Sequence, residues 1–371
     1  MSPTQISARP PGPARLDGLQ MLRFFAAASV LFVHTLHEAL SFDFAGPQSA
    51  VARAESWNFG AGVDVFFVLS GFLMFYISSD SFGAPGAQAK FLWRRIVRLV
   101  PLYWLFTVAM LLAMVAVPGQ LAHTQIQPAH ALASFAFVPW LDATGLPHPI
   151  LGLGWTLNYE MFFYLVFSFA LLLPRRIGLT AIFALFAIFA LINSLLDPSW
   201  VQAKFWSDPI IIEFLFGIGL AIAARRGWAL PAGIAWAAIA FGLAGLALAP
   251  RLAGNENELL RVLANGIPAA LMVAGAGSLR FARLSGPGRW LVLGGDASYA
   301  LYLSHPFTIN VMVLAWEKLH LGSPWAFAAL TGVVAVAASL VIHVVLERPL
   351  TRYLQGLGTT RRSPVAIKPA E

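Results

Sequence analysis

The sequence has no cysteine among its 371 residues and few charged side chains. Without cysteine there can be no disulfide, no thiolate zinc site and no cysteine nucleophile. Charged residues make up 11% of the chain, whereas soluble domains carry about 25%. The sequence also lacks a phosphate-binding glycine loop, a Gly-x-Ser-x-Gly motif and any histidine–carboxylate spacing typical of a metal site, so we assign no metal. These absences argue against the common classes of soluble enzyme.

Long apolar runs fill the chain instead, and 58% of its residues are hydrophobic. A run of about 20 residues is long enough to cross the hydrocarbon core of a bilayer as a helix. We therefore predict an all-α integral membrane protein, a bundle of about ten transmembrane helices. The expected spans lie near 18–38, 60–78, 99–117, 157–173, 177–195, 207–223, 229–249, 260–279, 291–316 and 325–346. This membrane domain, 17–350, is expected between an N-terminal tail, 1–16, and a C-terminal tail, 351–371.

The basic residues predict how this bundle is oriented. The net charge is +7, and most lysines and arginines fall in every second connection between the expected spans. In bacterial membrane proteins such an excess marks cytoplasmic loops, so both termini are expected in the cytoplasm of a multi-pass inner-membrane protein. The excess of positive charge is thus attributed to topology and to contact with membrane lipids, and no nucleic-acid partner is expected.

Two ionisable residues, Arg23 and His34, lie in the first expected span. Eleven residues separate them, which is about 20° more than three helical turns, so both side chains project from one face, about 16 Å apart along the axis. An ionisable group in a transmembrane helix is by default a functional candidate. The alternatives are that Arg23 extends to the cytoplasmic headgroups and that His34 bonds a neighbouring helix.

Two carboxylates are expected near the outer ends of spans. Asp64, in Gly62-Val63-Asp64-Val65-Phe66, is either a ligand or catalytic partner or an acid favoured by the helix dipole at an N-terminus. Glu160 is expected at the depth already assigned to His34. It is therefore either the group that orients the imidazole or a structural hydrogen-bond partner of another helix.

Three arginines, Arg94, Arg95 and Arg98, share a helix face at the cytoplasmic start of the third expected span. They are either a topology signal or a binding site for a polyanion, because planar guanidinium groups bind phosphates in a bidentate manner. In the latter case, several phosphates on the cytoplasmic side are implied, as in the nucleotide of coenzyme A.

Near the C-terminus, Ser298, Tyr302 and His305 are spaced i, i+4 and i+7 on one helical face. This face either lines a cavity or forms a polar seam between helices. After the last span, the segment Glu347-Arg348-Pro349 is expected to end the helix.

Five of these segments, in this order, resemble motifs of the acyltransferase-3 family of integral membrane acyltransferases. They are Leu16-Asp17-Gly18-Leu19 with Arg23 and His34; Gly62 to Phe72; Arg94 to Pro101; Trp155-Thr156-Leu157 with Glu160, Phe163 and Tyr164; and Ser298-Tyr299 with Tyr302 and His305. The resemblance covers about 15 to 350. The segment Gln20-Met21-Leu22-Arg23-Phe24-Phe25 resembles the corresponding segment in the branch of the family that modifies exopolysaccharides.

The resemblance implies an acyl-CoA donor substrate, usually acetyl-CoA, with no permanently bound cofactor. It implies a carbohydrate hydroxyl as acceptor, on a finished polysaccharide or a lipid-linked precursor. The positions of the family motifs imply that His34 corresponds to the essential histidine and Arg23 to its partner in the first motif. Glu160 corresponds to the acid that follows Trp-Thr-Leu. Transfer is completed by the membrane domain alone or with separate polysaccharide-assembly proteins.

Together these readings predict a membrane O-acyltransferase. The donor nucleotide docks at Arg94, Arg95 and Arg98, with the pantetheine arm passing Arg23. His34 acts as general base and is held by Glu160, or else forms an acyl-histidine intermediate. The residues expected to contact the substrate are Asp64, Tyr159, Tyr302 and His305. The alternative function is a proton-coupled transporter or flippase that uses His34 and Glu160 as a proton relay.

Overall fold

The computed structural model describes residues 16–41, 50–55, 57–116, 127–196, 198–253, 258–281 and 284–357. Nearly all of the predicted N-terminal tail, and residues 358–371 of the predicted C-terminal tail, lie outside the described residues. Within these ranges every regular element is a helix and no strand is present, so the predicted all-α fold is confirmed.

The long helices are α1 (Asp17–Ser41), α3 (Gly62–Ser78), α4 (Ala87–Ala116), α6 (Trp155–Ala170), α7 (Arg175–Leu196), α9 (Ile212–Arg225), α10 (Ala232–Ala253), α11 (Glu258–Ser278), α13 (Ser298–Lys318) and α14 (Pro324–Ile342). Shorter helices connect or extend them: α2 (Ala50–Glu55), α5 (Pro128–Phe135), α8 (Val201–Ser207), α12 (Gly286–Asp296) and α15 (Arg348–Leu357). Single turns of 3₁₀-helix, Phe59–Ala61, Gly152–Gly154 and Pro209–Ile211, precede α3, α6 and α9.

Eight helical segments of the described chain are long and apolar enough to cross a membrane. They are Asp17–Leu40, Ala50–Ser78, Ala87–Ala116, Arg175–Leu196, Val201–Arg225, Ala232–Arg251, Glu258–Ser278 and Pro324–Leu357. Eight of the ten expected spans therefore have a counterpart here. The remaining two correspond to α6, which has only 16 residues, and to the segment that contains α13.

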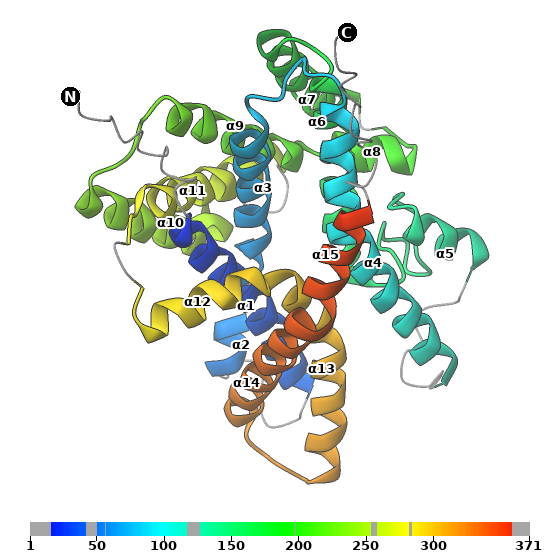
Figure 1. Ribbon diagram of the computed structural model, residues 1–371. Helices are drawn as coiled ribbons and strands as arrows, with labels where there is room; N and C mark the ends of the chain where they lie inside the picture. The colour runs from blue at the N-terminus through cyan, green and yellow to red at the C-terminus, as the bar shows by residue number, and fades with distance from the viewer. Residues whose placement is uncertain are drawn as a thin grey trace, which may run out of the picture.

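The expected single span 291–316 is wrong, because the structure divides it into two helices. Helix α12 ends at Asp296 and α13 begins at Ser298, and the two run in clearly different directions (Figure 1). The turn brings α12 across α1, where a β-carbon on Gly295 would collide with the carbonyl oxygen of Gln20. An apolar run in a sequence indicates burial in the membrane, but it does not show whether the chain changes direction inside that run.

The expectation that Glu347-Arg348-Pro349 ends the last helix is also wrong. A π-helical turn, His343–Glu347, joins α14 to α15, and the chain stays helical to Leu357. Pro349 lies in the first turn of α15, where the loss of an N–H is tolerated, and the wider π turn before it accommodates the ring. The structure thus adds a helical extension past residue 350.

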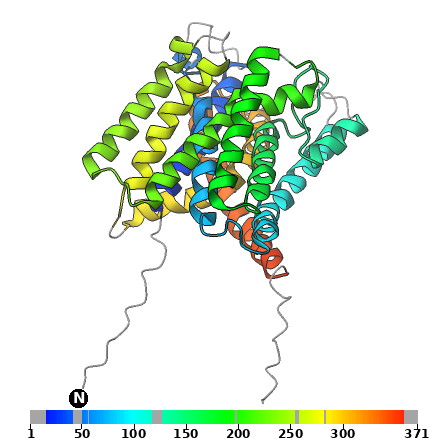
Figure 2. The same cartoon turned by 90° about the horizontal axis from the view of Figure 1, so that it is seen from above.

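Helix α1 occupies the middle of the bundle and packs against α3, α11, α12, α13 and α14 (Figure 1). Helices α10 and α11 lie side by side on one side of it, and α4 lies on the other (Figure 2). The 18-residue apolar windows of α7 and α10 are only 17% and 22% buried, so these helices form the periphery. The segments that carry the polar motifs lie nearer the centre.

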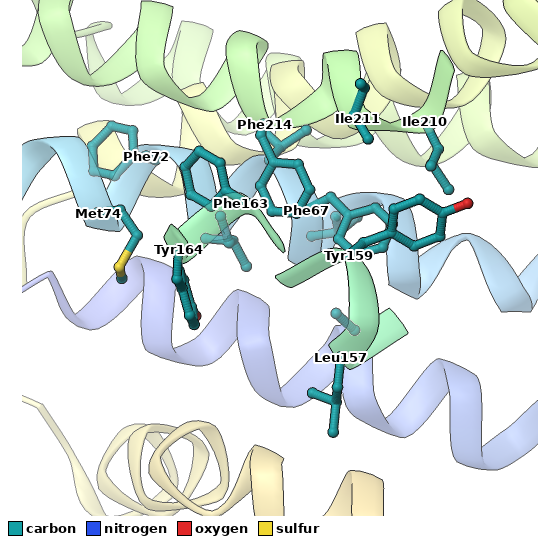
Figure 3. Close-up of a cluster of buried hydrophobic side chains, with 14 of the residues drawn as sticks. Phe67, Phe72, Met74, Leu157, Tyr159, Phe163, Tyr164, Ile210, Ile211 and Phe214 are labelled. Carbon is teal, nitrogen blue, oxygen red and sulfur yellow. The ribbon is translucent and has the colours of Figure 1, made fainter. Parts of the chain in front are cut away.

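Aromatic side chains from α3, α6 and α9 pack together in the core (Figure 3). The ring of Phe214 lies 4.3 Å from that of Phe163 and 4.9 Å from that of Phe67, measured between centroids. At one end of this row Tyr159 stacks on Phe205 at 4.1 Å. This packing fixes α6, which carries Glu160, against α3, which carries Asp64.

Helices α3 and α9 approach each other closely because small residues face one another. A β-carbon on Gly71 would collide with the carbonyl oxygen of Phe214, and one on Gly217 with that of Val68. Association of helices in lipid depends on such close packing, since lipid tails are as apolar as the helices themselves. By contrast, a β-carbon on Gly219 would meet no atom of the described residues within 4 Å.

The change Gly217→Ala is therefore expected to destabilise the protein by about 1–3 kcal/mol through overpacking. The change Gly219→Ala, on the same helix two residues away, should leave stability unchanged or raise it slightly, because alanine favours helix over glycine. Thermal unfolding of the two purified variants in detergent compares them directly. Equal melting temperatures would contradict the proposed role of Gly217.

Candidate active site

His34 on α1 lies against His305 on α13. The two imidazole rings are nearly parallel, at 13°, and Nδ1 of His34 is 3.0 Å from Nε2 of His305. His34 is half-buried, whereas only 1% of His305 is exposed. The Nδ1 atom of His305 is 3.0 Å from the carbonyl oxygen of Leu301.

These contacts determine which nitrogen of each neutral ring carries hydrogen. A carbonyl oxygen only accepts hydrogen bonds, so the Nδ1–H group of His305 donates to Leu301. The Nε2 atom of a neutral His305 then has a lone pair and accepts from Nδ1–H of His34. His34 is thereby held with Nε2 unprotonated, which is the form that can take up a proton.

A cavity of about 100 Å³ lies between α1, α3, α4, α6 and α13. We call it the inner cavity. Its polar lining residues are Arg23, Ser70, Arg95, Arg98, Thr156, Glu160, Tyr164, Ser298, Tyr299 and Tyr302. The ring of Tyr302 lies 6.1 Å from that of His305, so one wall of the cavity adjoins the histidine pair.

Glu160 is held within the inner cavity by two hydroxyl groups. The Oε1 atom accepts a hydrogen bond from Ser70 at 2.5 Å and another from Tyr164 at 2.7 Å. The expected partner of His34 was Glu160, but in the structure the hydrogen bond of His34 is with His305. Glu160 instead lines the same cavity as Arg23 and Arg95.

A larger cavity, about 560 Å³, lies next to the inner cavity, and we call it the vestibule. Six arginines line it, with two carboxylates: Arg94, Arg95, Arg98, Arg289, Arg348 and Arg352, with Asp296 and Glu347. Arg95 and Arg98 line both cavities, so the two cavities are adjacent. Among the described residues, the buried Nε of Arg95 has no hydrogen-bond partner. The vestibule is therefore suited to a polyanion, since guanidinium groups bind phosphate well.

A family model described as an acyltransferase domain matches residues 16–344 of this chain. The chain belongs to the acyltransferase-3 family. It is therefore an acyltransferase, a multi-pass membrane enzyme, and the resemblance noted from its motifs is confirmed. Membership favours this function over the proton-coupled transporter.

Several curated proteins are similar to this acyltransferase. The exopolysaccharide production protein ExoZ of Rhizobium meliloti (strain 1021) is 36% identical over 300 residues, which cover 79% of this chain and 89% of that protein. The acyltransferase MdmB of Streptomyces mycarofaciens is 27% identical, over 97% of this chain and 96% of its own length. The putative peptidoglycan O-acetyltransferase YrhL of Bacillus subtilis (strain 168) is 27% identical, over 90% of this chain and 55% of its own length. No solved structure was found to match the chain.

The structure of this acyltransferase brings most of the predicted site residues together. Arg23, Arg95, Arg98, Glu160 and Tyr302 line the inner cavity, and Arg94 joins Arg95 and Arg98 in the vestibule. Tyr302 also bonds Thr156 at 2.8 Å. Of the other four predicted residues, His34 and His305 form the histidine pair, and Asp64 and Tyr159 line separate cavities that adjoin Trp155.

Sequence analysis missed several residues of this region. Arg289, Arg348 and Arg352 complete the vestibule, and a pair formed by His343 and Glu347, at 2.8 Å, lines it from the π-helical turn. In the sequence, these three arginines lie among the other basic residues that connect or follow the expected spans, and no pattern indicates that they form one site. Glu213, a fully buried acid next to Asp64, was also missed, although an acid within the apolar run Ile210 to Phe216 was a signal.

Proposed function

We propose that this protein transfers an acetyl or other short acyl group from cytoplasmic acyl-CoA to a hydroxyl of a cell-surface carbohydrate or its lipid-linked precursor. The observation that carries the proposal is that the arginine-lined vestibule adjoins, across Arg95 and Arg98, a cavity whose wall at Tyr302 lies beside the His34–His305 pair. Similarity to an exopolysaccharide production protein and to a putative peptidoglycan O-acetyltransferase supports a carbohydrate acceptor.

In this proposal the protein lies in the inner membrane, with about ten spans and both termini in the cytoplasm. Helices α6 and α13 are the two further spans, sheltered by apolar neighbours. The vestibule residues then lie at the cytoplasmic surface, because they come from the start of α4, from α12 and from α15. This orientation agrees with the basic residues in alternate connections.

The phosphates of the donor bind to the arginines of the vestibule, and the pantetheine arm enters the inner cavity. Arg23, Arg95 and Arg98 lie along this path, and Glu160, fixed by Ser70 and Tyr164, offsets part of their positive charge and leaves an excess for the anionic donor. Glu160 thus contributes to catalysis by holding the cavity in shape rather than by touching His34.

The transfer step uses His34 as general base. Its Nε2 takes the proton of the acceptor hydroxyl while the hydroxyl oxygen attacks the carbonyl carbon of the thioester. The carbon–sulfur bond then breaks, and the departing thiolate takes the proton from the imidazolium. His305 holds the imidazole in the reactive tautomer through the hydrogen bond from Nδ1–H. The competing chemistry is an acyl-histidine intermediate, which would be recognised by ping-pong kinetics.

Deletion of the gene should remove acetyl-sized groups from the surface glycans. Mass spectrometry of the glycans with and without the gene measures this, and complementation with the intact gene should restore them. If the acyl content of every glycan fraction is the same in both strains, a carbohydrate acceptor is excluded.

The change His34→Gln should lower the rate of acyl transfer by about 10²–10⁴-fold, which is the usual contribution of a positioned acid–base group. Affinity for acetyl-CoA should stay the same, because the nucleotide binds at the vestibule. Initial rates with radiolabelled acetyl-CoA and calorimetric donor binding measure the two effects. His320→Gln, in an exposed turn after α13, is the matched control and should keep full activity. A fully active His34→Gln enzyme would falsify the mechanism.

The change His305→Phe should lower kcat by less than the loss caused by His34→Gln, because the base is still present but its tautomer is no longer fixed. In a protein that already carries His34→Gln, the second change should have no further effect, since His305 acts through His34. The double-mutant cycle on kcat tests this coupling. Additive losses would show that His305 has a role independent of His34.

The changes Arg98→Gln and Arg352→Gln should each weaken binding of coenzyme A by about 10- to 100-fold, through loss of charge-assisted hydrogen bonds. Binding should also weaken as salt rises, because exposed parts of the vestibule are screened. Calorimetry with the purified protein measures both effects. Arg176→Gln serves as the control, since Arg176 is exposed at the start of α7 and does not line the vestibule. Unchanged affinity in both variants would contradict the donor site.

A further inference from the structure

Two further cavities lie at the starts of α3, α6 and α11, away from the vestibule. One, of about 370 Å³, is lined by Asn58, Gly60, Ala61, Val63, Asp64, Trp155, Ile210, Ala249, Pro250, Arg261 and Asn265. The other, of about 520 Å³, has Tyr159, His148, Asn193, Lys204, Asp208 and Glu258 among its lining residues. Trp155 lines both, and we call the pair the outer cleft.

The polar groups of the outer cleft differ in kind from those of the vestibule. Positive and negative charges are mixed, and Arg261 lies 3.8 Å from Asp64 and 3.9 Å from Asp208. Two amides, Asn58 and Asn265, are bonded to each other at 2.8 Å. A ligand here meets both donors and acceptors, which suits a neutral molecule with many hydroxyl groups, since each hydroxyl both donates and accepts.

Aromatic rings form part of the same walls. The indole of Trp155 stands edge-on to the ring of Tyr159, with centroids 6.0 Å apart, and Tyr159 is itself stacked on Phe205. Aromatic faces provide rigid apolar surface next to polar groups. A sugar ring presents both kinds of surface, apolar C–H faces and polar hydroxyl edges.

A buried polar atom in the outer cleft lacks a hydrogen bond. Only 5% of Asp64 is exposed, and its Oδ1 has no hydrogen-bond partner among the described residues. Its nearest cation, Arg261, is too far away at 3.8 Å for a hydrogen bond. The carboxyl group of Asp64 also lies next to the buried Glu213. Because Asp64 lacks part of its possible hydrogen bonds, a ligand hydroxyl that reaches its carboxyl group would supply one.

The outer cleft also adjoins the region of the chemistry. Val63 lines both the outer cleft and the inner cavity. The neighbouring Gly62 packs against Ala26 and Val30 of α1, and Val30 lies one helical turn before His34. A ligand in the outer cleft is thus close to the end of the path that the acyl group takes.

We propose that the outer cleft binds the sugar residues of the acceptor, with Trp155 as stacking surface and Asp64 and Arg261 as hydroxyl ligands. This assignment rests on the proposed function. It means that donor and acceptor enter from opposite sides and meet near the His34–His305 pair. The reaction would then move an acyl group across the membrane without moving coenzyme A.

The test uses the full-length purified protein, radiolabelled acetyl-CoA and oligosaccharides released by acid hydrolysis from the surface polysaccharide of a strain without the gene. Trp155→Ala and Arg261→Gln should each raise KM for the oligosaccharides by about 10-fold or more, with KM for acetyl-CoA unchanged. Trp155→Phe keeps an aromatic face and should recover most of the affinity. The controls are Trp325→Ala and Arg251→Gln, two exposed residues outside the cleft.

The outcomes separate this inference from the function on which it rests. If the unaltered protein transfers acetyl groups but Arg261→Gln leaves the KM for the oligosaccharides unchanged, as does Trp155→Ala where that variant folds, the cleft is not the acceptor site. If the unaltered protein binds acetyl-CoA but transfers nothing to any oligosaccharide, the proposed function itself is overturned. A rise in both KM values together would also contradict the inference, because it would place these residues on the donor path.

Discussion

The structure depends on one constraint, the high free-energy cost of a polar or ionisable group exposed to hydrocarbon. The constraint explains why α6 and α13, which supply much of the polar lining of the inner cavity, bury most of these polar side chains within the bundle. Every residue of α13 from Ser298 to His305 is buried, and α6 buries most of its polar face against α3 and α13. The apolar helices α7 and α10 lie at the periphery, where lipid replaces protein. Apolar helices thus enclose a polar interior in which chemistry on charged substrates becomes possible.

The enclosed polar groups are sorted by charge along the proposed path. The vestibule collects six arginines from α4, α12 and the C-terminal helix, the inner cavity mixes arginines with Glu160, and the outer cleft mixes both signs with amides and aromatic rings. A polyanion is attracted to the first region and a neutral polyol suits the last. Under the proposed function, such an arrangement gives the path a direction, since a highly charged donor would be bound at the vestibule and its uncharged arm would enter the inner cavity.

Much of this could be predicted from the sequence, and the errors have a common physical origin. Hydropathy and charge identified eight segments that the structure also gives as long apolar helices, and helical spacing placed Arg94, Arg95 and Arg98 on one face. These features are local in the chain. Depth in the membrane can also be estimated from the sequence, so Glu160 was a reasonable partner for His34. The depth of a residue, however, does not determine where its helix lies around the axis of the bundle. The contact between His34 and His305, and the approach of Arg289 and Arg352 to the α4 arginines, depend on how distant helices pack.

The identity of the partner of His34 has a consequence for the chemistry. A carboxylate next to the base would stabilise the imidazolium, but it would bring a permanent charge into the membrane interior, at a considerable desolvation cost. A second imidazole fixes the same tautomer while both rings are neutral, and its own Nδ1–H is satisfied by the carbonyl oxygen of Leu301. Burial of the resting site therefore costs little desolvation free energy. In the proposed mechanism, charge develops on the imidazole only when it takes the proton of the acceptor hydroxyl. The carboxylate of Glu160 is instead held by two hydroxyls in the inner cavity, which Arg23, Arg95 and Arg98 also line, so positive charge surrounds it.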